Sequence, residues 1–167
     1  LSSELFRVYR SEDVIGVELG GALKNIIAIG AGFIDGAELG GNTKAAMVTR
    51  GLHEITRLGV AMGARPDTFA GLSGMGDLIA TCYSSLSRNY RLGVGLASGR
   101  DLKTVLKDLG QTAEGAPTTQ AAVRLAKELN IEMPITDATH AVLFEGASPE
   151  DAVRELMGRT LQPEVRY

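Results

Sequence analysis

Apolar residues recur every three to four positions along most of the chain, which is the period of an amphipathic α-helix. The pattern is clearest over residues 45–62, where Met47, Leu52, Ile55, Leu58 and Met62 fall on one broad stripe. A short helix is predicted to start at Pro66 and to break at the glycines of residues 71–76. The same period predicts further helices over residues 22–34, 77–83, 87–97, 102–109, 118–130, 136–144 and 149–157.

Residues 5–19 follow a different pattern, because they are rich in Val, Ile, Phe and Tyr. We predict one or two strands there. Two short strands alone are marginally stable, so they either pair with each other or join strands upstream. The chain starts at Leu1 rather than Met, which favours the second alternative and a truncated sequence. The predicted class is all-α, with a short extended N-terminal segment.

The composition argues against several classes of function. The 167 residues suit one domain, and a net charge of −3 with scattered Lys and Arg argues against nucleic-acid binding. The apolar runs are short and broken by glycine, so no membrane span is predicted, and no leader opens the chain. We therefore expect a cytoplasmic protein. Cys82 is the single cysteine, and we interpret it as a small buried residue rather than a nucleophile.

Glycine is unusually frequent, with 21 residues, or roughly twice the usual share of about 7%. Many of these glycines lie in or beside predicted helices, where each costs about 1 kcal/mol relative to Ala. Either they allow close packing of helices and helix ends, or they let a ligand approach the backbone. Gly30 and Gly32 do not form a dinucleotide-binding loop, because no third glycine follows and the segment is helical.

Lys24 and Asn25 form the first candidate site, near a helix start among small and apolar residues. A lysine in such surroundings is poorly solvated, which suits it to act as a base. The alternative is that its side chain simply extends to solvent.

The second candidate site spans residues 73–89. Asp77 and Thr81 are four positions apart and would share one helix face. Ser87 can cap the next helix, which places Arg88 and Asn89 in its first turn beside free N–H groups, a suitable seat for a phosphate. The alternative is a capped surface helix with a solvated arginine. His53 and His140 lack metal-ligand spacing, so no metal site is predicted.

The chain resembles bacterial NAD(P)-dependent glycerol-3-phosphate dehydrogenase from about Phe6 onward. Three elements carry the resemblance, in the same order as in that family: VELGGALKNIIAIGAGFIDG, GLSGMGDLIATCYSSLSRNYRLG, and GQTAEG followed by PIT. The resemblance implies a helical domain of the 6-phosphogluconate dehydrogenase C-terminal type over residues 20–167. Residues 1–19 would then be the trailing strand segment, or linker, of a Rossmann domain that is missing here.

The resemblance also implies site roles. The reaction would be the oxidation of sn-glycerol 3-phosphate to dihydroxyacetone phosphate, or its reverse, with NAD or NADP as cofactor and a role in glycerophospholipid synthesis. Lys24 would be the proton acceptor, held by Asp77 as its catalytic partner. The implied substrate contacts are Lys24, Asn25, Asp77, Thr81, Ser87, Arg88 and Asn89. The implied cofactor contacts are Arg88, Thr112 and Glu114.

Two alternatives stay open beside this enzyme: another dehydrogenase of the same helical superfamily, and a stand-alone helical dimerisation or interaction module. The SRN element after GDL argues against the first. The missing nucleotide domain favours the second, and leads us to expect that residues 1–167 alone are inactive. A homodimer is compatible with the sequence.

Overall fold

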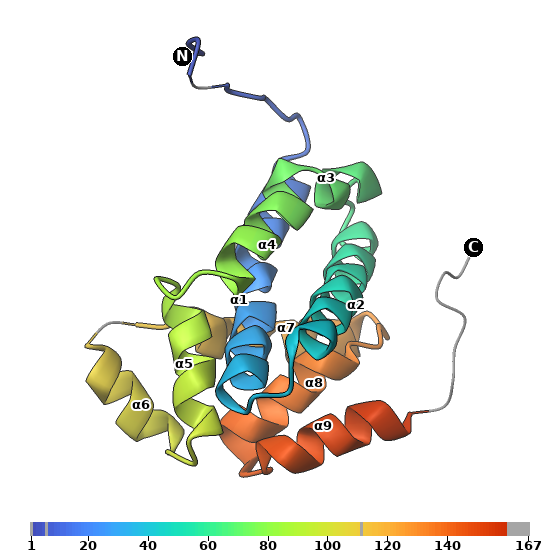
Figure 1. Cartoon of the computed structure of the whole chain (residues 1–167). Coiled ribbons are helices and arrows are strands. Elements are labelled where there is room, and N and C mark those ends of the chain that lie inside the picture. Colours follow the sequence, from blue (N-terminus) through green and yellow to red (C-terminus); the bar gives the residue numbers. More distant parts are fainter. Residues whose placement is uncertain (1, 6, 111, 160–167) are drawn as a thin grey trace.

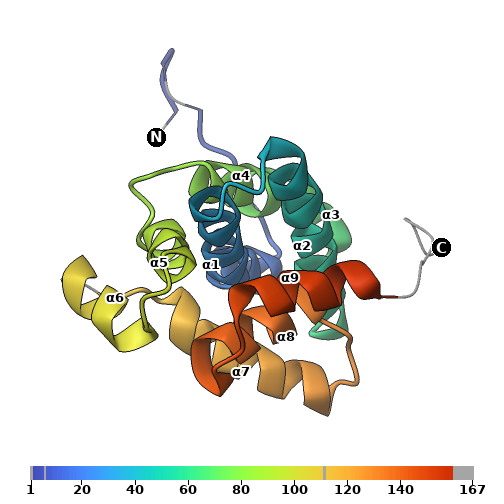
Figure 2. The same cartoon turned by 60° about the horizontal axis from the view of Figure 1, so that its bottom comes forward.

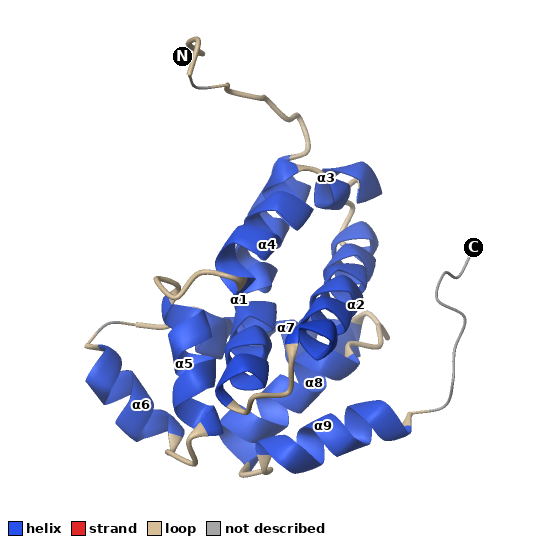
Figure 3. Cartoon of the chain, viewed as in Figure 1, coloured by secondary structure: helices blue, strands red, loops and turns tan. Residues whose placement is uncertain are grey.

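The computed structural model describes residues 2–5, 7–110 and 112–159. Within them the chain is helical, and no strand is assigned to any described residue (Figure 3). The elements in chain order are α1 (Val14–Gly36), α2 (Gly41–Ala61), α3 (Pro66–Ala70), the π-helical turn η1 (Leu72–Gly76), α4 (Asp77–Cys82), α5 (Arg88–Ala97), α6 (Leu102–Leu109), α7 (Gly115–Glu128), α8 (Pro134–His140), the π-helical turn η2 (Ala141–Glu145) and α9 (Pro149–Gly158). The all-α class is thus confirmed.

Helix α1 is the centre of the molecule. It packs against α2, α4, α5, α7 and α8, and Figures 1 and 2 both show it with α5 on one side and α2 on the other. Its residues Ile26, Ile27, Ala28 and Ala31 are almost completely buried. The core is therefore built around one apolar helix whose whole circumference is covered over its middle turns.

Glycines bring α1 and α5 unusually close. A Cβ atom added at Gly32 would overlap the backbone of Tyr90, and one added at Gly93 would overlap the carbonyl of Ile29. By contrast, a Cβ atom at Gly21 would meet nothing within 4 Å. Of the two explanations for the glycines, close helix packing applies at Gly32 and Gly93.

Helix α1 is also long and apolar enough to cross a membrane, judged by length and composition alone. The glycines do not interrupt it, contrary to the interpretation of this run as broken. Half of its most apolar window is buried inside the molecule, however, and the core helix of a soluble protein passes the same test. This helix is therefore weak evidence for a membrane span.

The prediction of strands over residues 5–19 is wrong for all the residues described there, because none is in a strand and α1 already begins at Val14. Asp13 starts this helix: its Oδ1 accepts a hydrogen bond from the Gly16 amide at 3.0 Å, as an N-cap does. Its Oδ2 accepts from the Arg65 amide at 2.9 Å and from the Thr68 hydroxyl at 2.6 Å, which ties α1 to α3. These bonds, first those from Thr68 and Gly16, lower the pKa of Asp13. Residues 7–11 have no assigned secondary structure, and Phe6 lies outside the described residues.

The other predicted helices are confirmed, with shifted ends. Between α3 and α4 only Gly71 departs from helix geometry, and residues 72–76 then form a wide π-helical turn instead of the predicted break. Helix α7 starts at Gly115, three residues earlier than predicted, and α8 passes into the turn η2 at Ala141. Ser148 caps α9, accepting from the Asp151 amide at 3.1 Å.

Candidate functional site

Lys24 and Asp77 form an ion pair between α1 and α4. Lys24 Nζ lies 2.5 Å from Asp77 Oδ1, and the two side chains are 19% and 40% exposed. Asp77 is the first residue of α4, directly after the turn η1. This turn approaches α1 at Gly20, where an added Cβ atom would lie 2.5 Å from the Ser73 carbonyl oxygen. The glycine one turn before Lys24 thus lets η1 come near enough to place the carboxylate on the ammonium, and the pair stays accessible from outside.

Thr81 follows Asp77 by one turn of α4, as predicted. Its hydroxyl donates a hydrogen bond to the Asp77 backbone carbonyl at 2.6 Å. The hydroxyl proton is therefore engaged within the helix, while the oxygen keeps lone pairs that can accept a bond from a ligand. Thr81 is partly buried.

Asn25 and Asn89 meet in the interface between α1 and α5. Asn89 Nδ2 donates to Asn25 Oδ1 at 2.8 Å, and Asn89 Oδ1 accepts from the Gly115 amide at 2.8 Å. Asn25 Nδ2 donates to the Gly21 carbonyl at 3.3 Å. Both side chains are buried, so they join α1, α5 and the start of α7 from within. Each amide nitrogen retains a second N–H that these bonds do not use.

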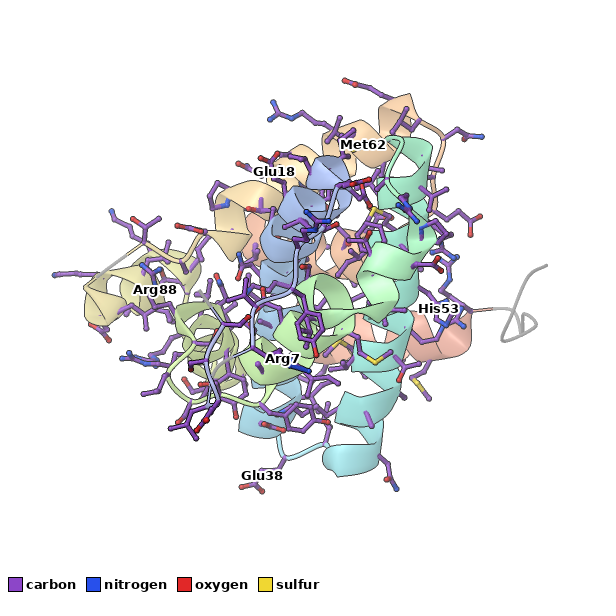
Figure 4. All side chains as sticks on the ribbon, turned by 90° about the horizontal axis from the view of Figure 1, so that it is seen from above. Arg7, Glu18, Glu38, His53, Met62 and Arg88 are labelled. Atoms are coloured by element: carbon purple, nitrogen blue, oxygen red, sulfur yellow. The ribbon has the colours of Figure 1, made fainter. Side chains whose placement is uncertain are left out.

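Ser87 and Arg88 start α5 in the predicted way. The Ser87 hydroxyl accepts from the Tyr90 amide at 3.3 Å, and Arg88 is the first residue of the helix. Arg88 is exposed, and no hydrogen bond or ion pair joins its guanidinium to another residue that the structure describes. Figure 4 shows it on α5, at the side of the molecule near α6.

Thr112 and Glu114 lie in the connection between α6 and α7, and both are exposed. The Glu114 carbonyl accepts from the Thr118 hydroxyl at 2.7 Å, whereas its carboxylate forms no capping bond to α7. Glu114 directly precedes Gly115, the residue bonded to Asn89. The structure thus brings this connection to the start of α5.

The two candidate sites proposed from the sequence are therefore one site. Lys24 and Asn25 are consecutive on α1, with Lys24 paired to α4 and Asn25 bonded to α5. This turn of α1 thus joins the accessible Lys24–Asp77 pair to the start of α5, where Arg88 is exposed.

A buried cation close to this site had no signal in the sequence. Lys44, on α2, is only 4% exposed, and its Nζ lies 2.5 Å from Asp35 Oδ2. Neither apolar periodicity nor a motif distinguishes it among its neighbours Thr43, Ala45 and Ala46. A buried charged residue of this kind becomes visible only when the fold brings its partners together.

Other candidates lie apart from the site. Figure 4 shows His53 on α2, on the opposite side of the view from Arg88, and its side chain is exposed. His140 contacts Glu145 at 3.0 Å. Within the described ranges, no group of three potential metal ligands occurs. Cys82 is completely buried, and burial raises the pKa of its thiol to about 12, which makes it a poor nucleophile.

A cavity of about 650 Å³ lies apart from this site, lined by residues between Leu96 and Leu106 and between Val142 and Pro149. None of the candidate site residues lines it. The Lys24–Asp77 pair is accessible from outside, and a second wall over it would enclose a small ligand.

Comparison with known proteins identifies the family. Residues 13–154 match the family model described as NAD-dependent glycerol-3-phosphate dehydrogenase C-terminus. The chain is 58% identical over 163 residues to a glycerol-3-phosphate dehydrogenase [NAD(P)+] of Halalkalibacterium halodurans, covering 98% of this chain and 47% of that relative. It is 54% identical over 163 residues to the enzyme of the same name from Citrifermentans bemidjiense, covering 98% and 49%.

Solved structures agree. The crystal structure of glycerol-3-phosphate dehydrogenase from Coxiella burnetii superposes with a TM-score of 0.91 at 45% identity, over 95% of this chain and 49% of that one. The glycerol-3-phosphate dehydrogenase of Saccharomyces cerevisiae superposes with a TM-score of 0.85 at 28% identity, over 95% and 46%. The chain spans about half the length of the curated relatives it matches. It belongs to the family of NAD-dependent glycerol-3-phosphate dehydrogenase C-terminal domains.

Proposed function

We propose that this chain is the substrate-binding and catalytic half of an enzyme that interconverts sn-glycerol 3-phosphate and dihydroxyacetone phosphate with NAD or NADP. The observation that carries the proposal is the accessible Lys24–Asp77 pair, which the bond between Asn25 and Asn89 links to the start of α5. One end of a phosphorylated alcohol needs a base, and the other end needs a cation with free amide donors. This surface offers both.

Lys24 acts as the proton acceptor in this proposal. When the secondary alcohol is oxidised, its hydroxyl proton passes to Lys24 Nζ, which must be in its neutral form at that moment. In the reverse reaction the ammonium returns the proton to the carbonyl oxygen. Asp77 holds Nζ through the 2.5 Å contact, so the lysine is a pre-positioned base rather than a mobile surface chain.

The substrate phosphate binds at the start of α5. The guanidinium of Arg88 is exposed there. The backbone N–H groups of the first turn point out of the helix end, where the positive end of the helix dipole also lies. Ser87 contributes from the N-cap. Asn25, Asn89 and Thr81 complete the substrate contacts through the N–H groups and lone pairs that their internal bonds leave unused.

The nicotinamide cofactor, when bound, accepts or supplies the hydride. Arg88, Thr112 and Glu114 fit contacts on this side of the cofactor, because all three are exposed and polar and lie on segments next to the start of α5. We assign the rest of the cofactor site to a preceding Rossmann domain, with residues 20–167 as the helical domain and residues 1–19 leading into it. Because α1 starts at Val14, the final part of that lead is already helical. Residues 1–167 alone are then expected to be inactive.

The same proposal includes a cytoplasmic location, a homodimer and small-molecule substrates, with no nucleic-acid partner and no membrane span. The enzyme's product would feed glycerophospholipid synthesis. The mass of the full-length enzyme in solution checks the proposed homodimer, and the mass of a monomer would contradict it.

A substrate panel tests the proposed reaction. The full-length protein is assayed for reduction of NAD and NADP with sn-glycerol 3-phosphate, and with glycerol as the matched alcohol without phosphate. We expect reduction with the first and a much lower rate with the second, because only the phosphate can bind Arg88. Equal rates with both alcohols, or no reduction with either, would refute the proposal.

A further inference from the structure

Lys44 lies in a closed cage of one carboxylate and two aromatic rings. Its Nζ is 2.5 Å from Asp35 Oδ2, 4.1 Å from the centroid of the Tyr83 ring and 5.0 Å from that of the Tyr90 ring. Such distances allow cation–π attraction, which strengthens when the cation is removed from water, as Lys44 is at 4% exposure. The cage accounts for the burial of this charge.

The members of the cage also hold one another. The Tyr90 hydroxyl donates to Asp35 Oδ2 at 2.7 Å, on the same oxygen that contacts Lys44. Burial acts to raise the pKa of Asp35, but the hydrogen bonds from Lys44 and Tyr90 outweigh it and lower that pKa. The bond to Asp35 and burial together raise the pKa of Tyr90 to about 12. Asp35 is thus ionised and Tyr90 neutral throughout the neutral range.

The two rings mark the two ends of one connection in the site. Tyr83 ends α4, the helix that begins with Asp77 and carries Thr81. Tyr90 lies in the first turn of α5, directly after Arg88 and Asn89. A single cation therefore contacts the end of the element that carries the catalytic carboxylate and the start of the element that carries the phosphate seat. The charges of Lys44 and Lys24 both act to lower the pKa of Cys82, the residue before Tyr83, so both ammonium groups lie near it.

We propose that Lys44 is a positioning residue. Through its contacts with Tyr83 and Tyr90 it holds residues 83–90 in place. It thereby sets the distance between the Lys24–Asp77 pair and the phosphate seat at Ser87–Asn89. This inference rests on the function proposed above. Lys44 touches no substrate in this arrangement, and it acts through the placement of Arg88. A merely structural lysine would support the whole domain, whereas a positioning lysine supports chiefly this connection.

A double-mutant cycle in the full-length enzyme distinguishes these two roles. Lys44→Met keeps length and apolar packing but removes the charge, and we expect it to raise KM for glycerol 3-phosphate by about 10- to 100-fold with a smaller change in kcat. In an Arg88→Ala background the same change should have little further effect on KM, because the misplaced group is already absent. Additive effects in the two backgrounds would overturn the proposal. Arg100→Met, which removes an exposed cation paired with Asp108, is the control and should leave KM unchanged.

If Lys44→Met does not fold, variants at Tyr83 still test the proposal. The Tyr83 side chain is 54% exposed, so its replacement is tolerable. Tyr83→Phe keeps the ring over Lys44 and should leave KM unchanged, whereas Tyr83→Leu removes the ring and should raise KM as Lys44→Met does. Equal KM values for the Phe and Leu variants would contradict a role for the cation–π contact between Lys44 and the Tyr83 ring. Lys44→Arg keeps the cation, so its KM should lie between those of the unmodified enzyme and Lys44→Met, and a KM as high as that of Lys44→Met would count against the proposal.

Hydrogen exchange resolved by peptide gives a readout that does not depend on activity. Lys44→Met should raise amide exchange within residues 83–90 while leaving the core turns of α1 unchanged. Unchanged exchange at residues 83–90, or a uniform rise over the domain, would overturn the positioning role. If the unmodified enzyme fails to oxidise glycerol 3-phosphate, the proposed function is wrong, and the exchange result still decides whether Lys44 holds this connection.

Discussion

Asn89 on α5 donates a 2.8 Å hydrogen bond to Asn25 on α1, and the same Asn89 side chain accepts one from the Gly115 amide. Asn89→Ala would leave a buried amide and a buried carbonyl oxygen without partners. We expect a loss of roughly 1 to 3 kcal/mol in the free energy of unfolding, measured by urea denaturation. The neighbouring exposed Arg88→Ala is the matched control and should stay within about 0.5 kcal/mol of the unmodified protein. Equal stability of the two variants would show that these hydrogen bonds do not stabilise the fold.

The close approach of α1 and α5 predicts opposite effects at two glycines. Gly93→Ala forces the two helices apart, because the new Cβ atom overlaps the Ile29 carbonyl. We expect it to lower the free energy of unfolding by at least about 1 to 3 kcal/mol. Gly21→Ala meets open space inside a helix and should be neutral or stabilising by up to about 1 kcal/mol. A neutral Gly93→Ala in thermal unfolding would contradict this packing.

Glu54 on α2 holds the start of α8 from inside the core. It is 2% exposed, and its carboxylate accepts from the Ile135 amide at 2.7 Å and from the Thr136 amide and hydroxyl at 3.1 Å. Burial outweighs these hydrogen bonds and raises the pKa of Glu54 from 4.5 to about 7.

The pH dependence of stability follows from this shift. Because the folded state holds the Glu54 proton more tightly than the unfolded state, the contribution is fully present below pH 4.5 and is lost as pH rises through about 7. The full effect is on the order of 3 kcal/mol. Urea unfolding of the unmodified protein and of Glu54→Gln at pH 5 and pH 8 isolates it: the loss on going to pH 8 should be smaller in Glu54→Gln. Equal losses in the two proteins would rule out this assignment.

Local signals predicted most of the helices. Ser87 caps α5 as predicted, and the apolar period located α2, α5 and α6 to within a few residues. The strand prediction fails at residues 14–19 because it rests on Val14, Ile15 and Val17, which favour β-structure. The Asp13 cap and packing against the rest of the core override that preference.

The candidate site could be predicted only in part, because its parts come from distant segments. The sequence indicates Lys24 as a base and Ser87–Arg88 as a phosphate seat, and the resemblance assigns Asp77 to Lys24. Nothing local predicts the bonds from Asn25 to Asn89 and on to Gly115, which span 64 and 26 residues. The wide turn at residues 72–76 and the cage of Lys44 likewise depend on tertiary contacts.

Arg88 is expected to act on substrate binding rather than on folding. A charge-assisted bond to phosphate is worth roughly 1.5 to 3 kcal/mol, so Arg88→Ala should raise KM for glycerol 3-phosphate by about 10- to 150-fold in the full-length enzyme. Arg91, also exposed and one turn further along α5, is the control, and Arg91→Ala should change KM little. An unchanged KM for Arg88→Ala would show that the substrate phosphate does not bind Arg88 at the start of α5.

The central claim is that Lys24, held by Asp77, exchanges the proton of the substrate alcohol. The most direct measurement is the turnover of Lys24→Ala in the full-length enzyme at saturating substrate and cofactor, with and without an added small primary amine. We expect kcat to fall by about 100- to 10,000-fold and the amine to restore part of it, because it supplies the missing base. A Lys24→Ala enzyme that turns over at the unmodified rate would contradict the assignment.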